Sequence, residues 1–133
     1  MNVQDLPKDQ QVYSLIKKGL DAASERSKVS ANNIANINTK GYKRRYVTFE
    51  ENLKQSMDGI ELKKTDDKHM SLNNEHGNIE VKRDDSTSLK EDGNNVDIEN
   101  EEVNQAANAL MYNALIAQAN ARLSETKYVI DGR

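Results

Sequence analysis

The sequence predicts a mainly α-helical fold, in which long N- and C-terminal helices pack together like a coiled coil. A polar, partly disordered or small β insert lies between them in the sequence. Three observations lead to this prediction. Residues 13–37 carry apolar and small side chains at alternating spacings of three and four, and residues 97–129 are rich in alanine and leucine. The chain between them is polar, without a sustained period, which indicates partial disorder or a small β structure. We therefore expect a discontinuous helical domain of residues 1–40 and 96–133, with residues 41–95 as a variable insert.

The first helix is predicted from about Lys8 to Asn38. Asp5 and Pro7 favour a helix start, and Gly41 follows the last periodic residue. Small residues in the middle of the seam let another backbone approach but bury little apolar area, so the helix needs packing partners. The seam consists of Tyr13, Ile16, Leu20, Ala23, Ser27, Ser30, Ile34 and Ile37.

The insert contains two short alternations, Tyr42–Val47 and Ile79–Val81, which favour one or two short strands. Glycine-containing segments at His76–Asn78 and Asp92–Asn94 are typical of turns. We expect little regular structure elsewhere in this part of the chain.

The second helix is predicted from Asp97, a favourable N-cap, to about Val129, with Lys127 in the last turn and Gly132 as a stop signal. Its apolar residues surround the helix axis on nearly every side, and one partner helix covers only one face. We therefore expect the remaining face to meet other copies or other proteins. These residues are Ala106, Ala107, Ala109, Leu110, Met111, Tyr112, Ala114, Leu115, Ile116, Ala117 and Ala119.

Composition excludes several classes of protein. Among 133 residues, apolar residues make up 35% and the mean hydropathy is -0.91, so a conventional buried core is not expected. The absence of cysteine excludes disulfides and thiolate chemistry, and the net charge of -3 does not favour binding to polyanions. The N-terminus lacks the pattern of a cleaved secretory signal, and no segment has the length and apolarity of a membrane span.

Few residues could carry chemistry. His69 and His76 have no further ligand at helical spacing, so we interpret them as loop histidines. The acidic segment Glu91–Glu102 has a glycine directly after Asp92, whereas a calcium loop needs glycine at its sixth position. No phosphate loop, nucleophile elbow or Ser/His/Asp set is present. We expect no catalytic residue, no cofactor and no metal.

A basic cluster leaves a nucleic-acid-binding module as a distant alternative, because cations interleaved with aromatic rings can hold phosphates and stack on bases. The other interpretation is a solvated turn after a helix, which we favour for an acidic chain. The cluster consists of Lys40, Lys43, Arg44 and Arg45 with Tyr42, Tyr46 and Phe49.

Both ends of the chain resemble the flagellar rod and hook family of axial proteins. Residues 30–45 resemble the family's N-terminal signature at Ala31, Asn32, Asn33, Ile34, Ala35, Asn36, Asn38, Thr39, Gly41, Tyr42 and Lys43. Residues 93–133 are similar to the end of a proximal-rod subunit, at Asn94, Asn95, Val96, Asp97, Asn108, Tyr112, Leu115, Lys127, Tyr128, Ile130, Gly132 and Arg133. The middle of the chain shows no such resemblance.

The resemblance implies a non-catalytic subunit whose terminal helices pack with neighbouring subunits into a tube around an export channel. Its partners would be itself, other rod proteins, basal-body ring or adaptor components and the flagellar type III export apparatus, with no nucleic acid and no membrane insertion. It would lie in the rod outside the inner membrane, exported without a cleaved signal. The alternatives are another axial protein, and a soluble helical adaptor or flagellar export chaperone.

Two sets of residues follow from this interpretation. We expect subunit contacts at Ile16, Leu20, Ala23, Ile34, Ile37, Leu110, Tyr112, Leu115, Ile116 and Leu123. Phe49 and Leu53 resemble the short phenylalanine-to-aliphatic segment by which early rod and hook subunits are recognised at the export gate. The alternative is that Phe49 and Leu53 pack a small apolar cluster of their own.

Overall fold

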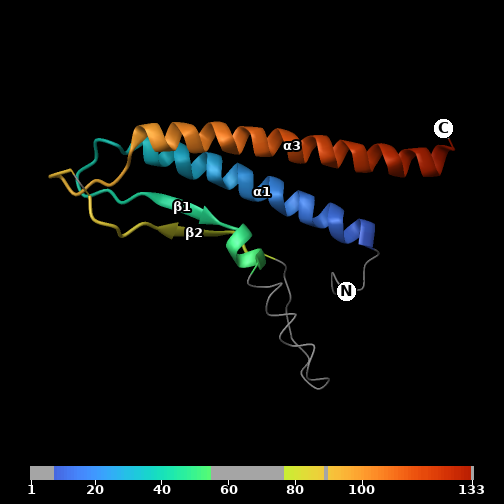
Figure 1. Cartoon of the computed structure of the whole chain (residues 1–133), viewed down its shortest axis with the longest axis horizontal. Helices are drawn as coiled ribbons and strands as arrows, with labels where there is room; N and C mark the ends of the chain where they lie inside the picture. The colour runs from blue at the N-terminus through green and yellow to red at the C-terminus, as the bar shows by residue number, and fades with distance from the viewer. Residues whose placement is uncertain (1–7, 55–76, 89, 133) are drawn as a thin grey trace, which may run out of the picture.

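The computed structural model describes residues 8–54, 77–88 and 90–132, and the predicted mainly helical architecture is confirmed (Figure 1). Helices α1 (Lys8–Ala35) and α3 (Ile98–Asp131) lie side by side and run in opposite directions. Strands β1 (Arg45–Thr48) and β2 (Glu80–Arg83) form a two-stranded antiparallel ribbon on the α1 side of the pair. The helices separate toward the start of α1 and the end of α3 (Figure 1).

Helix α1 begins at the predicted residue and ends three residues before the predicted end. Turns replace the helix after Ala35, where the Asn36 N–H is shared between the carbonyls of Asn32 and Asn33 at 3.2 Å each. Gly41 follows with a φ of 72°, a left-handed conformation that favours glycine. Asp5 and Pro7, which predicted the helix start, lie outside the described residues.

Both predicted ends of α3 are confirmed to within two residues. The Asp97 carboxylate accepts a hydrogen bond from the Glu99 N–H at 3.0 Å, and Gly132 closes the helix with a φ of 67° and a hydrogen bond to the Tyr128 carbonyl. Lys127 is a correction: because α3 continues to Asp131, its last turn contains no basic residue. At about 1.5 Å per residue the helix is about 51 Å long.

The buried face of α1 is rotated slightly from the predicted seam. Ile16, Ala23 and Ser30 are buried as expected, but Ser27 is exposed and the contact also includes Gly19, Ala22, Val29 and Asn33. A Cβ added at Gly19 would lie only 3.1 Å from Leu115 Cδ1, which shows how closely the helices approach there. Among the small residues of the predicted seam, Ala23 lies close to α3, where Asn108 donates to its carbonyl at 2.8 Å, whereas Ser27 is exposed.

The ribbon confirms the predicted short strands, each shifted slightly along the chain. Val47 pairs with Val81 and Arg45 with Arg83; the second half of β1 is buried, whereas all of β2 is exposed. Phe49, directly after β1, is buried beneath Gly77, where an added Cβ would lie 2.8 Å from the phenyl ring. In the described part of the chain, no helix is long and apolar enough to cross a membrane.

Candidate functional site

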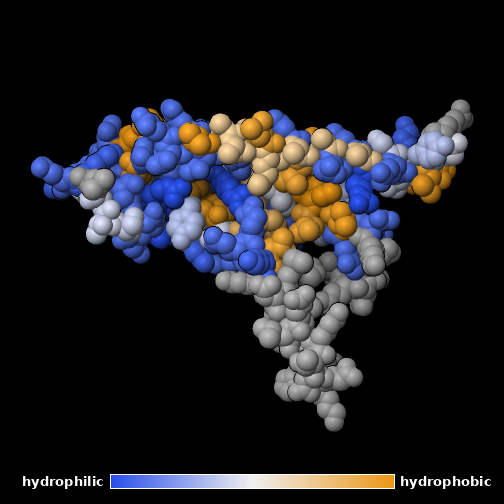
Figure 2. Space-filling view, viewed as in Figure 1, coloured by the Kyte–Doolittle hydropathy of each residue, from blue (hydrophilic) through white to orange (hydrophobic). Residues whose placement is uncertain are grey.

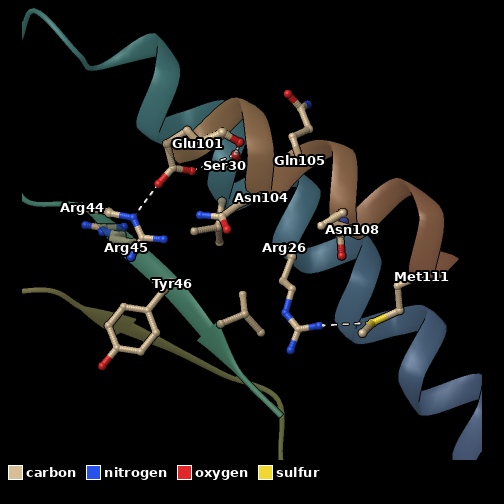
Figure 3. Close-up of a pocket in the computed structure, with 13 residues that line it drawn as sticks. Arg26, Ser30, Arg44, Arg45, Tyr46, Glu101, Asn104, Gln105, Asn108 and Met111 are labelled. Carbon is tan, nitrogen blue, oxygen red and sulfur yellow. Dashed lines mark hydrogen bonds and ion pairs between the residues drawn. The ribbon is translucent and has the colours of Figure 1, made fainter. Parts of the chain in front are cut away.

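A buried carboxylate joins the helix pair to the ribbon. Glu101, in the first turn of α3, is only 2% exposed and accepts three hydrogen bonds from side chains, two of them from Ser30 and Arg44, which lie beside it in Figure 3. The donors are Ser30 Oγ at 2.8 Å, Asn33 Nδ2 at 3.2 Å and Arg44 Nε at 2.5 Å. The carboxylate also lies near the N-terminal end of a helix, where negative charge is favourable. Its burial is thus compensated by one cation and two neutral donors.

Asn33 fixes β1 against α1. Its side-chain N–H donates to the Arg45 carbonyl at 2.7 Å, and its Oδ1 accepts from the Arg45 N–H at 3.0 Å. The same Oδ1 accepts from the Tyr42 hydroxyl at 3.2 Å. Because Asn33 is 1% exposed and uses both ends of its amide, only a side chain of this shape and polarity serves here.

Asn94 closes the C-terminal end of α1. Its Nδ2 lies 2.8 to 2.9 Å from the carbonyls of Asn36, Ile37 and Thr39, and its Oδ1 accepts from the Val96 N–H. These carbonyls belong to the turns that follow Ala35, and those of Asn36 and Thr39 also accept backbone N–H groups. A fully buried asparagine from the segment before α3 thus holds these turns, so the two halves of the chain are tied together twice by polar side chains.

Sequence reasoning missed the role of Glu101. The family signature did include Asn33, Asn94 and Asn95, although nothing in their spacing indicated burial. Asn95 also proves structural: its Oδ1 accepts from the Arg44 N–H at 2.6 Å. The other signature residues of the first helix and turn are exposed or half-buried.

The basic cluster does not assemble into a phosphate clamp. Lys43 donates to the Ser86 carbonyl at 3.1 Å and Arg44 binds Glu101, so these two cations serve the fold. Within the described residues no group of histidines and carboxylates is arranged for a metal. His69 and His76 themselves lie outside the described residues. The acidic segment forms a turn followed by the Asp97 cap.

Helix α3 has a largely exposed apolar surface. No charged residue stands between Val103 and Ala121, although charged residues make up 31% of the chain. Leu110 is 73% exposed and Val103 67%, and apolar side chains are visible along the helix in Figure 2. Six exposed residues follow a spacing of four and three, and we call them the α3 stripe: Val103, Ala107, Leu110, Ala114, Ala117 and Ala121.

The residues expected at subunit contacts divide into three groups. Ile16 and Ala23 are buried within the chain's own helix pair. Leu20, Ile34, Ile37 and Leu115 are half-buried. Leu110, Tyr112, Ile116 and Leu123 are exposed on α3.

A second apolar surface lies where the two helices separate. A groove of about 750 Å³ opens between the first turns of α1 and the last turns of α3, with Tyr13, Leu123, Val129 and Ile130 among its lining residues. Arg122 of α3 bridges it by an ion pair to Asp9 at 3.0 Å. Val129 and Ile130 are 81% and 76% exposed, so the end of α3 is nearly uncovered.

Comparisons with known proteins agree on one family. A family model described as "Flagella basal body rod protein" matches residues 17–43, which include Asn33. The flagellar basal body rod protein FlgB of Bacillus subtilis is 34% identical over 117 residues, covering 88% of this chain and 91% of that protein. FlgB of Borrelia hermsii is 36% identical over 121 residues, covering 84% and 86%. FlgB of Aeromonas hydrophila is 29% identical over 114 residues.

Proposed function

Because this chain belongs to the FlgB family of flagellar basal-body rod proteins, a family with a structural role, we propose that it is a non-catalytic subunit of the proximal rod. In this proposal α3 packs against neighbouring subunits, and the assembled helices form the tubular drive shaft around the export channel. Residues 1–40 and 96–133 form the assembly domain, and residues 41–95 form the outer insert. The partners are other copies and other components of the basal body.

The observation that carries the proposal is the uncharged, exposed surface of α3. A solvated helix normally displays charged side chains on its outer face, whereas exposed contiguous apolar surface marks a site of association. The α3 stripe has the spacing of a coiled-coil seam, and its four alanines allow a neighbouring backbone to approach closely. The outer face of α1, by contrast, carries Lys17, Asp21 and Lys28.

The assignment of contacts can be refined from burial. Leu110, Tyr112, Ile116 and Leu123 are accessible to a neighbouring subunit, as the proposal requires. Ile16 and Ala23 would instead act indirectly, by holding α1 against α3. The groove at the diverging helix ends would be filled in the assembly.

The test is Leu110→Asp, with Lys28→Asp on the exposed face of α1 as the control. Because Leu110 is 73% exposed, the variant should keep the circular dichroism spectrum and unfolding midpoint of the wild type. We expect it to be absent from purified hook–basal bodies and to abolish swimming, whereas Lys28→Asp is incorporated normally. Incorporation of Leu110→Asp at the wild-type level would contradict the proposal.

A soluble helical adaptor or export chaperone is the alternative from another class. Such a protein would cover the α3 stripe in a stable dimer of its own and would stay in the cytosol. Sedimentation of the purified chain distinguishes the two: the rod proposal expects a monomer at low concentration, with the protein recovered in basal bodies.

We also propose that Phe49 and Leu53 are recognised during export without a cleaved signal. Phe49 is 5% exposed and lies beneath Gly77, so recognition at an export gate would require this part of the insert to open. We expect Phe49→Ala and Leu53→Ala to reduce secretion strongly, while Tyr46→Ala, at a half-exposed position, does not. Unchanged secretion of both variants would show that these residues serve only the local apolar cluster.

A further inference from the structure

The outer edge of β1, which does not pair with β2, lies across a groove of about 280 Å³ from α3 (Figure 3). The Arg44 carbonyl accepts from the Asp84 N–H at 2.8 Å, and the register pairs Tyr46 with Lys82. Backbone groups alternate in direction along an antiparallel strand. Those of Arg44 and Tyr46 therefore face β2, and those of Arg45 and Val47 face away from it.

On this edge of β1 the backbone groups of Arg45 have hydrogen-bond partners, whereas the N–H of Val47 has none among the described residues. The Asn33 amide makes with Arg45 the two hydrogen bonds that a residue of a neighbouring strand would make. At Val47, which lines the groove, the N–H finds no partner in residues 8–54, 77–88 and 90–132. The groove thus contains a short length of unpaired strand edge.

The opposite wall offers primary amides. Asn108 donates to the Ala23 carbonyl at 2.8 Å, but its Oδ1 is buried and unpaired among the described residues. Asn104, one turn earlier on α3, also lines the groove. A buried acceptor without a donor is energetically unfavourable. Both walls therefore present groups that a polypeptide backbone can satisfy.

The free charge at the groove is positive. Arg26 is neutralised by Glu50, and Arg44 by Glu101. Arg45 is exposed, and its guanidinium meets no carboxylate in the described part of the chain. An acidic side chain is the complement that this arrangement lacks.

We propose that this groove binds an extended acidic segment of another polypeptide, which adds to β1 as a strand. Its backbone would pair with Val47 and with the amides of Asn104 and Asn108, and its carboxylate would meet Arg45. Strand addition of this kind takes its affinity from main-chain hydrogen bonds and its specificity from the side chains between them. Of the α3 stripe only Ala107 lines this groove, so strand addition here would use a surface largely distinct from the stripe.

The test is an NMR titration of the ¹⁵N-labelled full chain with two capped hexapeptides, Thr-Glu-Val-Thr-Glu-Val and Thr-Lys-Val-Thr-Lys-Val. We expect the acidic peptide, at about millimolar concentration, to shift the Val47 amide and the side-chain amides of Asn104 and Asn108. It should bind about threefold more tightly than the basic peptide, as one solvent-exposed ion pair allows.

Two variants separate charge from fold. Arg45→Glu should reverse the preference between the peptides, whereas Lys17→Glu, the same change of charge at an exposed position of α1 outside the groove, should leave it unchanged. The dispersed amide spectrum of each variant verifies its fold before titration. The proposal is overturned if neither peptide shifts the Val47 amide, if both bind equally, or if the shifts fall instead on stripe residues outside the groove, such as Leu110 and Ala114.

Discussion

Arg44 and Glu101 stand 57 residues apart in the sequence, yet Arg44 Nε lies 2.5 Å from Glu101 Oε1, in an ion pair whose carboxylate is almost fully buried and whose arginine is half-buried. The backbone N–H of Arg44 also donates a hydrogen bond to Asn95 Oδ1, and its guanidinium Nη1 lies 4.0 Å from Asp84 Oδ2. One arginine thus joins the start of the ribbon to the first turn of α3. The described part of the chain buries few apolar side chains, so this polar junction of Arg44, Glu101, Asn33 and Ser30 is important for stability.

Glu101→Ala should destabilise the fold by about 2–5 kcal/mol, because it leaves the buried Asn33 and Ser30 donors and the half-buried Arg44 without their common acceptor. Urea unfolding followed by circular dichroism measures the change. Glu102→Ala, at the exposed neighbouring position, serves as the control and should stay within about 0.5 kcal/mol. Equal effects of the two substitutions would contradict a special role of Glu101.

Asn33→Ala should cost about 1–3 kcal/mol, since it removes the amide that satisfies the Arg45 N–H and carbonyl. Hydrogen exchange should show faster exchange of the Arg45 amide than in the wild type. Asn32→Ala, one residue earlier and exposed, leaves those hydrogen bonds intact and should change neither measurement appreciably. An Arg45 amide that stays protected in Asn33→Ala would refute this account of the junction.

Gly77→Ala should be far more destabilising than Gly41→Ala, although both glycines have a left-handed φ, of 65° and 72°. The backbone conformation alone costs a non-glycine residue about 1–2 kcal/mol. At Gly77 an added Cβ would in addition lie 2.8 Å from the Phe49 ring, whereas nothing lies within 4 Å at Gly41. Unfolding midpoints of the two variants provide the comparison, and equal midpoints would exclude the contact with Phe49.

Ionised Glu50 should make a small contribution to the stability of the fold, and this contribution should be lost at acidic pH. Partial burial raises its pKa, but the hydrogen bond from Arg26, the backbone hydrogen bond and the charge of Arg26 together hold the pKa below its usual value. A lowered pKa in the folded state stabilises above the unfolded pKa, and this contribution is lost as the pH falls through the folded pKa. The side chain is 53% exposed, so solvent screens the pair and the effect is modest.

The measurement for Glu50 is the unfolding free energy of wild type and Glu50→Gln between about pH 3 and pH 7, bracketing the ordinary range for a glutamate. The loss of stability on acidification should be smaller in Glu50→Gln, while Glu51→Gln, which is exposed, should follow the wild type. Parallel curves for all three proteins would show that the Arg26 pair does not influence stability.

The helices could be predicted because their signals are local. Asp97 and Gly132 specify the ends of α3 by capping chemistry, and the spacing of Ile16, Ala23 and Ser30 indicates a packed face. The exact orientation of α1 could not be predicted, because Gly19 and Ala22 give no hydrophobic signal and their burial depends on where Leu115 lies. How closely α1 and α3 approach depends on the residues of both helices together, so the sequence of one helix does not indicate it.

The polar junction was beyond sequence reasoning for a related reason. Glu101 looks like any acid that favours a helix N-terminus, and only the return of the chain at Asn94 brings it over Ser30 and Asn33. Similarly, Arg44 resembles its exposed neighbours Lys40 and Arg45 in sequence. Burial of a charge is decided by tertiary partners far along the chain, which no local pattern records.

The lack of charge from Val103 to Ala121 also determines how association through α3 would respond to its surroundings. Long-range electrostatic attraction accelerates encounter between charged surfaces and is screened by salt. A neutral stripe has neither property, so its association would be slow at low concentration and nearly indifferent to ionic strength. In the proposed assembly, subunits of this kind would need to be delivered close to their site of assembly. The contact between them would then be stable at low and at high ionic strength.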